Sequence, residues 1–149
     1  MELIITVWVP WSGKTTLYQS YKDYMYVGFD DIMDELYTKH LLKNVWRNDS
    51  ETKDEMNRRT IEYLIQWKNV YYDDTNYKSD DRKKIIKEMR RIKDVRIKCI
   101  YFKLPLKEIK KRNKNREWEL EERIIERYYN ETEEVTIEEW RDEIKVLSL

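Results

Sequence analysis

Two kinds of segment alternate along the chain, and they differ in how their hydrophobic residues are spaced. Apolar runs rich in β-branched and aromatic residues predict strands at 3–9, 24–28, 69–73, 95–104 and 144–147. Between them, apolar residues recur every three or four positions, which predicts helices at 14–22, 30–42, 51–67, 79–91, 105–116 and 119–130. Strands that alternate with helices predict an α/β fold, with one parallel sheet, helices on both of its faces and a single domain spanning 1–149.

Residues of chemical interest fall at the ends of the predicted strands. Residues 10–13 interrupt the first apolar run, Asp30 and Asp31 follow the second, and an acidic turn at 73–76 follows the third. Ligands of parallel sheets bind outside the carboxyl ends of the strands, so a site is expected at this edge. A purely structural alternative stays open, because Asp30 or Asp31 could cap the next helix, as Ser79 could cap another.

Composition limits the classes of protein to which the chain can belong. Hydrophobic and charged residues each make up 40% of the 149 residues, enough apolar material for a core. The 30 basic and 30 acidic residues cancel, so no overall field favours a long nucleic acid or a membrane surface. Cys99 is the single cysteine, which excludes an internal disulfide. The chain begins without the basic region of a signal peptide, so we expect a cytoplasmic protein with no membrane partner.

The segment WVPWSGKT, residues 8–15, is similar to a phosphate-binding P-loop. The pattern is G-x-x-x-x-G-K-[ST], in which backbone N–H groups and a helix N-terminus meet the phosphates. Gly13, Lys14 and Thr15 match it, and Trp8 stands at the first glycine. The expected ligands are ATP and Mg²⁺, with Thr15 on the metal. The loop residues expected to hold ATP are Pro10, Trp11, Ser12, Gly13, Lys14, Thr15 and Thr16.

Further segments extend this likeness in the same order along the chain. They are FDDI at 29–32, WKNVYYDDTN at 67–76, RNKNR at 112–116 and EEWRDEI at 138–144. Together with residues 8–15, they resemble the polynucleotide-kinase-like P-loop kinases, whose corresponding segments include GxPGSGKST, GKNVIIDDTN and EEGFDEI. The resemblance covers nearly the whole chain and implies a P-loop fold with a short helical lid.

The resemblance also implies a role for each matching residue. Asp30 would take the proton from the acceptor hydroxyl, while Lys14 and the lid residues Arg112 and Arg116 would neutralise the transferring phosphoryl group. Residues implied to contact the acceptor are Asp31, Asp74 and Thr75, and those implied to hold Mg²⁺ are Thr15 and Asp73. The implied acceptor is the 5′-hydroxyl of a nucleic acid or a nucleoside-like molecule. The family's arginine on the acceptor side falls on Met33, so that phosphate contact differs here.

Several alternatives remain at this point. The chain could be a nucleotide-binding module without catalytic activity, or a nucleoside monophosphate or metabolite kinase. Residues 107–116 could be an ordinary solvated basic face, and the 73–76 segment only a turn. His40 is interpreted as a helix-end residue and Cys99 as core. Tyrosines near the acidic turn, Tyr71, Tyr72 and Tyr77, could stack on a base.

The tryptophans form a pattern of their own. Trp8, Trp11, Trp67 and Trp140 all stand where the resemblance has glycine, and the chain has 6 tryptophans but only 2 glycines and no alanine. Glycine in a phosphate loop permits close backbone approach, which an indole at position 11 would obstruct. We hypothesise that these codons are UGA read as glycine by the organism that makes the protein. Tryptophans in a decayed loop are the alternative.

Overall fold

Five parallel strands form the sheet at the centre of the computed structural model, which describes residues 1–10, 14–38, 49–117, 119–140 and 142–148. The strands are β1 (Glu2–Val7), β2 (Met25–Gly28), β3 (Val70–Asp73), β4 (Arg96–Phe102) and β5 (Glu143–Leu147). Their spatial order is β2-β3-β1-β4-β5, and every pairing between neighbours is parallel. On β1 at the centre, Ile4 lies opposite Tyr71 of β3 and Lys98 of β4. The predicted parallel sheet is therefore confirmed.

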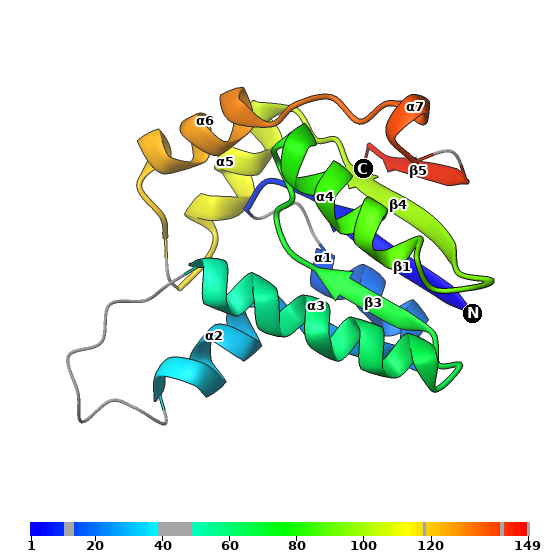
Figure 1. Ribbon diagram of the computed structural model, residues 1–149. Helices are drawn as coiled ribbons and strands as arrows, with labels where there is room; N and C mark the ends of the chain where they lie inside the picture. The colour runs from blue at the N-terminus through cyan, green and yellow to red at the C-terminus, as the bar shows by residue number, and fades with distance from the viewer. Residues whose placement is uncertain (11–13, 39–48, 118, 141, 149) are drawn as a thin grey trace.

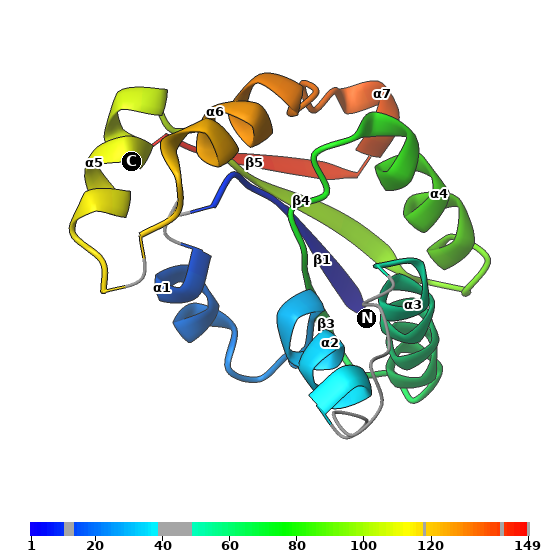
Figure 2. The same cartoon turned by 90° about the vertical axis from the view of Figure 1, so that its left-hand side faces the viewer.

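Helices cover both faces of this sheet (Figures 1 and 2). They are α1 (Lys14–Tyr18), the 3-10 turn η1 (Gln19–Tyr21), α2 (Phe29–Thr38), α3 (Asp49–Ile65), α4 (Ser79–Met89), α5 (Leu106–Lys114), α6 (Glu122–Glu131) and α7 (Ile137–Trp140). Figure 2 shows α1 on the opposite side of the sheet from α3 and α4. The helices α5 and α6 pack against each other beside the ends of β1 and β4, around Ile109 and Ile125.

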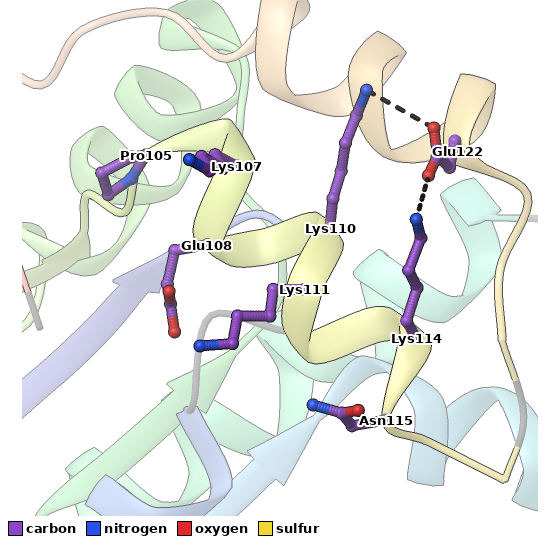
Figure 3. Close-up of a pocket in the computed structure, with 8 residues that line it drawn as sticks. All are labelled: Pro105, Lys107, Glu108, Lys110, Lys111, Lys114, Asn115 and Glu122. Atoms are coloured by element: carbon purple, nitrogen blue, oxygen red, sulfur yellow. Dashed lines mark ion pairs between the residues drawn. The ribbon is translucent and has the colours of Figure 1, made fainter.

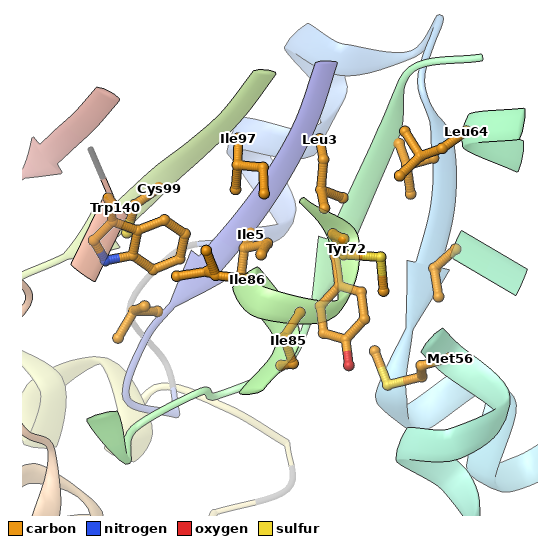
Figure 4. Packing of buried hydrophobic residues seen from close by; sticks show 14 of the residues in the cluster. Leu3, Ile5, Met56, Leu64, Tyr72, Ile85, Ile86, Ile97, Cys99 and Trp140 are labelled. Carbon is orange, nitrogen blue, oxygen red and sulfur yellow. The ribbon is translucent and has the colours of Figure 1, made fainter. Parts of the chain in front are cut away.

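The main core lies between the sheet and the helices α3, α4 and α7. Inward-facing strand residues such as Leu3, Ile5 and Ile97 meet Met56 of α3 and Ile86 of α4, all of them at most 5% exposed (Figure 4). Cys99 belongs to this core, and burial raises the pKa of its thiol, so the interpretation of Cys99 as a core residue is confirmed. Successive buried aliphatic side chains on β1 face both helix layers, which is why its sequence is a continuous apolar run.

The other face of the sheet is covered by tyrosines. Tyr18 and Tyr21 pack with Tyr26 and Tyr71 at ring-centroid distances of 4.6–6.2 Å. Tyr71 and Tyr72 are fully buried, so the suggestion that they stack on a ligand base is wrong. Both belong to β3, whose side chains point alternately into the two core layers.

Several predicted helix boundaries are corrected, among them those of α2, α4 and α5. Helix α2 begins at Phe29, so Asp30 and Asp31 lie in its first turn rather than at its cap. Ser79 is the first residue of α4, whose N-cap is Lys78, and the Ser79 hydroxyl donates to Glu139. Helix α5 ends at Lys114, and the short α7 was not predicted because four residues are too few to show a helical period.

Candidate active site

A cavity of about 860 Å³ opens at the carboxyl ends of β1, β2 and β3. Its walls come from segments that are distant in sequence: the residues after β1, the first turns of α1, α2 and α3, the turn after β3, α4, and the α5–α6 connection with α6. The lining residues are Trp8, Pro10, Thr16, Phe29, Asp30, Asp49, Ser50, Lys53, Asp74, Thr75, Tyr77, Asp81, Arg116, Leu120, Ile124 and Tyr128. The predicted location of the site, outside the carboxyl ends of the strands, matches this cavity.

The predicted phosphate loop leads into this cavity. Pro10 and Thr16 line it from either side of the loop. Lys14 and Thr15 begin α1, so the loop ends at a helix N-terminus, as phosphate binding requires. The contacts expected of Trp11, Ser12 and Gly13 lie outside the described residues, as do those of the Lys14 and Thr15 side chains.

Asp73, the predicted metal residue, is buried at the end of β3 and accepts hydrogen bonds from the side chains of three described residues. The Nε1 of Trp8 donates to its Oδ1 at 3.0 Å, Thr6 Oγ1 to the same atom at 3.2 Å, and the Tyr26 hydroxyl to Oδ2 at 2.6 Å. Burial and the Asp73 carboxylate raise the pKa of Tyr26, which keeps that hydroxyl protonated as a donor. Trp8 lines the cavity, whereas Asp73 does not.

Asp74 lines the cavity although it is only 5% exposed. Its Oδ1 accepts the backbone N–H of Thr75 at 2.7 Å. Its Oδ2 has no hydrogen-bond partner in the described structure but lies 3.4 Å from Nζ of Lys53. Burial raises the pKa of Asp74, and the Lys53 ammonium opposes that rise. Lys53 could not be identified from its sequence position, because that position carries no motif and only the tertiary fold brings α3 to this turn.

The turn after β3 is anchored by residues that sequence reasoning missed. Asn76 has φ 45° and donates from Nδ2 to the Thr6 carbonyl at 2.8 Å. The fully buried guanidinium of Arg82 donates to the carbonyls of Asn76 and Tyr77 and pairs with Glu139 at 3.1 Å. A turn held in this way presents Asp74 and Thr75 to the cavity in a fixed position.

The predicted catalytic Asp30 is exposed and lines the cavity from the first turn of α2. Asp31 is exposed beside it but is not among the lining residues. The structure thus brings Asp30, Asp74 and Thr75 to one cavity with the two ends of the phosphate loop.

The two predicted lid arginines are placed differently. Arg116 lines the cavity, whereas Arg112 lies on α5 with its Nε 3.2 Å from Glu108 Oε1. Because α5 ends at Lys114 and not at 116 as predicted, Arg112 and Arg116 do not lie on one helix. Arg116 instead follows the helix, where its N–H donates to the Asn113 carbonyl.

A second cavity, of about 710 Å³, lies along α5 (Figure 3). Lys110 and Lys114 reach from α5 to the Glu122 carboxylate of α6, with N–O distances of 3.5 and 3.6 Å. These ion pairs join α5, which carries the start of the predicted lid segment 112–116, to α6, and they neutralise part of the basic charge of α5.

Mg²⁺ is the metal that the phosphate loop implies, and its preferred ligands are carboxylate and phosphate oxygens with several waters. Asp74 fits that preference, because it lines the cavity and its buried Oδ2 accepts no hydrogen bond among the described residues, although it faces the Lys53 ammonium. Asp73, whose two oxygens already accept hydrogen bonds, would reach the ion through a bound water. Within the described ranges, no group of three or more His, Cys, Asp or Glu side chains is placed to hold a metal ion. No helix among those described is long and apolar enough to cross a membrane.

Comparisons with known proteins agree with this geometry. A family model described as an AAA domain matches residues 3–149. A gluconokinase from Sinorhizobium meliloti 1021 has a TM-score of 0.64 at 11% identity, covering 99% of this chain and 81% of that one. A sugar kinase from Janibacter sp. HTCC2649 has a TM-score of 0.65 at 15% identity, covering 99% and 84%. These likenesses establish the fold.

The Pnkp1/Rnl/Hen1 complex contains a chain that is similar over 80% of this one and 40% of its own length, with a TM-score of 0.62 and 21% identity. No curated protein matches the sequence. The fold is therefore that of small P-loop kinases, including one from a complex that contains Pnkp1.

Proposed function

Because the chain belongs to the AAA domain family, of P-loop kinase type, we propose that it transfers the γ-phosphate of ATP to a hydroxyl group. The observation that carries this proposal is the single cavity lined by both ends of the phosphate loop, Asp30, the Asp74–Thr75 turn and Arg116. Phosphoryl transfer needs these components: a phosphate cradle, an acceptor base, and positive charge opposite the transferring group.

In the proposed reaction, the acceptor oxygen bonds to the γ-phosphorus while the bond from that phosphorus to the bridging oxygen of ADP breaks. Asp30 accepts the proton that the hydroxyl loses. Lys14, Arg112 and Arg116 neutralise the transferring group, and the backbone of residues 10–16 holds the phosphates. Thr15 and Asp73 would hold Mg²⁺, which supplies further charge neutralisation when bound. Asp31, Asp74 and Thr75 orient the acceptor, which is a 5′-hydroxyl of a nucleic acid or a nucleoside-like molecule.

Transfer of label from ATP to acceptor tests this assignment. Asp30→Asn should keep ATP binding but slow transfer by about 100-fold or more, because general base catalysis contributes roughly 10²–10⁴. The control is Asp34→Asn, an exposed residue one turn along α2 that does not line the cavity. Wild-type turnover in Asp30→Asn would remove Asp30 from the role of base.

A second candidate is a P-loop module that no longer transfers phosphate. It is favoured by the indole of Trp8, which lines the cavity and donates a hydrogen bond to Asp73. The two functions separate in a variant carrying Trp8→Gly and Trp11→Gly. Phosphate transfer by this variant, but not by the chain with tryptophan at positions 8 and 11, would assign the loss of activity to the two indoles.

A further inference from the structure

The charges on one side of the cavity limit the acceptors that it can take. The acceptor side is formed by α2, α3, the turn after β3, and α4, which contribute the carboxylates of Asp30, Asp49, Asp74 and Asp81. Lys53 is the one cation that the described residues place on this side. Its ammonium lies 3.4 Å from Asp74 Oδ2 and 3.9 Å from Asp81 Oδ2.

Lys53 is the shared partner of Asp74 and Asp81, so its one positive charge against four carboxylates leaves this side with a surplus of three negative charges. Arg116, the other cation that lines the cavity, belongs to the opposite wall and to the proposed phosphate-transfer machinery. Like charges repel, and they repel more strongly beside a protein wall than in bulk water because the effective dielectric constant is lower there. A phosphodiester or phosphomonoester on the acceptor would meet this repulsion.

Hydroxyl groups suit the same wall. Ionised carboxylates only accept hydrogen bonds, and the hydroxyl groups of a sugar ring donate them. Thr75, which also lines the cavity, can donate to ring oxygens or accept from hydroxyls. These carboxylates therefore form hydrogen bonds with a ligand that carries several uncharged hydroxyl groups, and they repel a phosphate.

The remaining lining is aromatic and aliphatic. Tyr77 and Tyr128 pack edge to face with their ring centroids 5.3 Å apart, and Leu120 and Ile124 lie on the same α6 side. Aromatic side chains stack on the faces of ring-shaped ligands such as bases. The cavity volume also falls in the range of small-molecule sites, roughly 300–1,000 Å³.

We propose that the acceptor is a small, uncharged, ring-shaped polyol, either a nucleoside or a monosaccharide. This inference rests on the proposed function: it keeps the nucleoside among the acceptors proposed there, excludes a nucleic acid and adds monosaccharides. Tyr128 of α6 and Tyr77 of the turn after β3 contact the ring. Carboxylates of α2, α3 and α4 accept hydrogen bonds from its hydroxyl groups.

Matched acceptor pairs test the proposal. With Mg-ATP, each nucleoside is paired with its 3′-monophosphate, which presents the same 5′-hydroxyl with added negative charge. Monosaccharides and a 5′-hydroxyl oligonucleotide are assayed beside these pairs as further acceptors. The expected kcat/KM is at least tenfold higher for the uncharged member of each pair. Asp81→Asn should narrow that ratio, whereas Asp80→Asn, on the exposed side of α4, should leave it unchanged.

Each result decides one of the two claims. Transfer to nucleosides or to monosaccharides supports the proposal and says which ring is used. An equal or higher kcat/KM for the 3′-monophosphate or the oligonucleotide overturns the acceptor class but leaves the kinase assignment intact. If no acceptor is phosphorylated, calorimetric binding of the same pairs decides: tighter binding of the uncharged member supports the polyol site while the proposed function fails, and no preference overturns both.

Discussion

Trp67 has φ 61°, in the left-handed region that bulky side chains rarely adopt. Two other described residues share this region, Asn76 and Asp94, and both are types that tolerate it. Trp67 lies in the turn between α3 and β3 and is 68% exposed, so its indole gains little from burial. A glycine would adopt this conformation without strain, which supports the hypothesis that position 67 is glycine in the protein as its organism makes it.

Trp67→Gly should therefore raise the free energy of unfolding by about 1 kcal/mol, the cost of a left-handed conformation for a residue with a side chain. Chemical denaturation measures the change. Gln66→Gly is the matched control, because Gln66 is exposed and adjacent but has no positive φ, and it should lower stability. Loss of stability in Trp67→Gly would count against the hypothesis.

Trp140 and Trp8 test the same hypothesis from inside the molecule. Trp140 is fully buried, and its Nε1 has no hydrogen-bond partner in the part of the chain that is described, a deficit of about 1–3 kcal/mol.

Reading the gene should show TGA at positions 8, 11, 67 and 140, and peptide masses from the native cell should show glycine there. TGG codons at positions 8 and 11 would rule the hypothesis out.

A buried ion pair between α4 and α7 anchors the turn after β3, which presents Asp74 and Thr75 to the cavity. The guanidinium of Arg82, on α4, donates to Asn76 and Tyr77 in the turn, to the Glu134 carbonyl, and to Glu139 on α7. Neither charged side chain is more than 4% exposed. Removing one member leaves the other buried without its partner, which is costly.

Arg82→Met should lower the free energy of unfolding by about 3–5 kcal/mol. The double variant Arg82→Met with Glu139→Leu should recover part of this loss, because no unpaired charge remains buried. Lys83→Met, exposed on the same helix, is the control. A single-variant loss below about 1 kcal/mol would show that the pair does not anchor the turn.

The same pair makes stability depend on pH. Burial raises the pKa of Glu139, but hydrogen bonds from Ser79 and Arg82 outweigh burial and leave the pKa below its ordinary value of 4.5. A carboxyl group with a lowered pKa stabilises the fold above its unfolded pKa, and this stabilisation is lost as pH falls through the folded value. The free energy of unfolding should thus decline below pH 4.5, and less steeply in Glu139→Gln. An identical slope in the variant would contradict the assignment.

Sequence periodicity predicted the elements better than it predicted their ends. Strands β1 and β3 were found because both of their faces are buried, which makes their sequences continuously apolar. Ends depend on tertiary contacts: Ser79 could not be distinguished from a cap without knowing that Glu139 lies beside it. Lys53 was missed for the same reason, since its proximity to Asp74 comes from the packing of α3 against β3.

For the whole molecule, a net charge of zero conceals a local separation of charge. Carboxylates gather on the α2, α3 and α4 side of the cavity, and Arg116 faces them from the α5–α6 connection. Composition could exclude a strong overall field, but it could not show where the charges meet. This separation fits a site that receives polyphosphate at one end and uncharged hydroxyls at the other.

Stabilisation by Mg-ATP tests the central claim, that the chain is an ATP-dependent kinase, most directly. Ligand at 100 times its dissociation constant should add about 2.7 kcal/mol to the free energy of unfolding. The form with glycine at positions 8 and 11 should show this gain, and Lys14→Ala in that form should lose it, whereas Lys22→Ala, exposed beyond η1, should keep it. No stabilisation of the glycine form by Mg-ATP would contradict the kinase assignment.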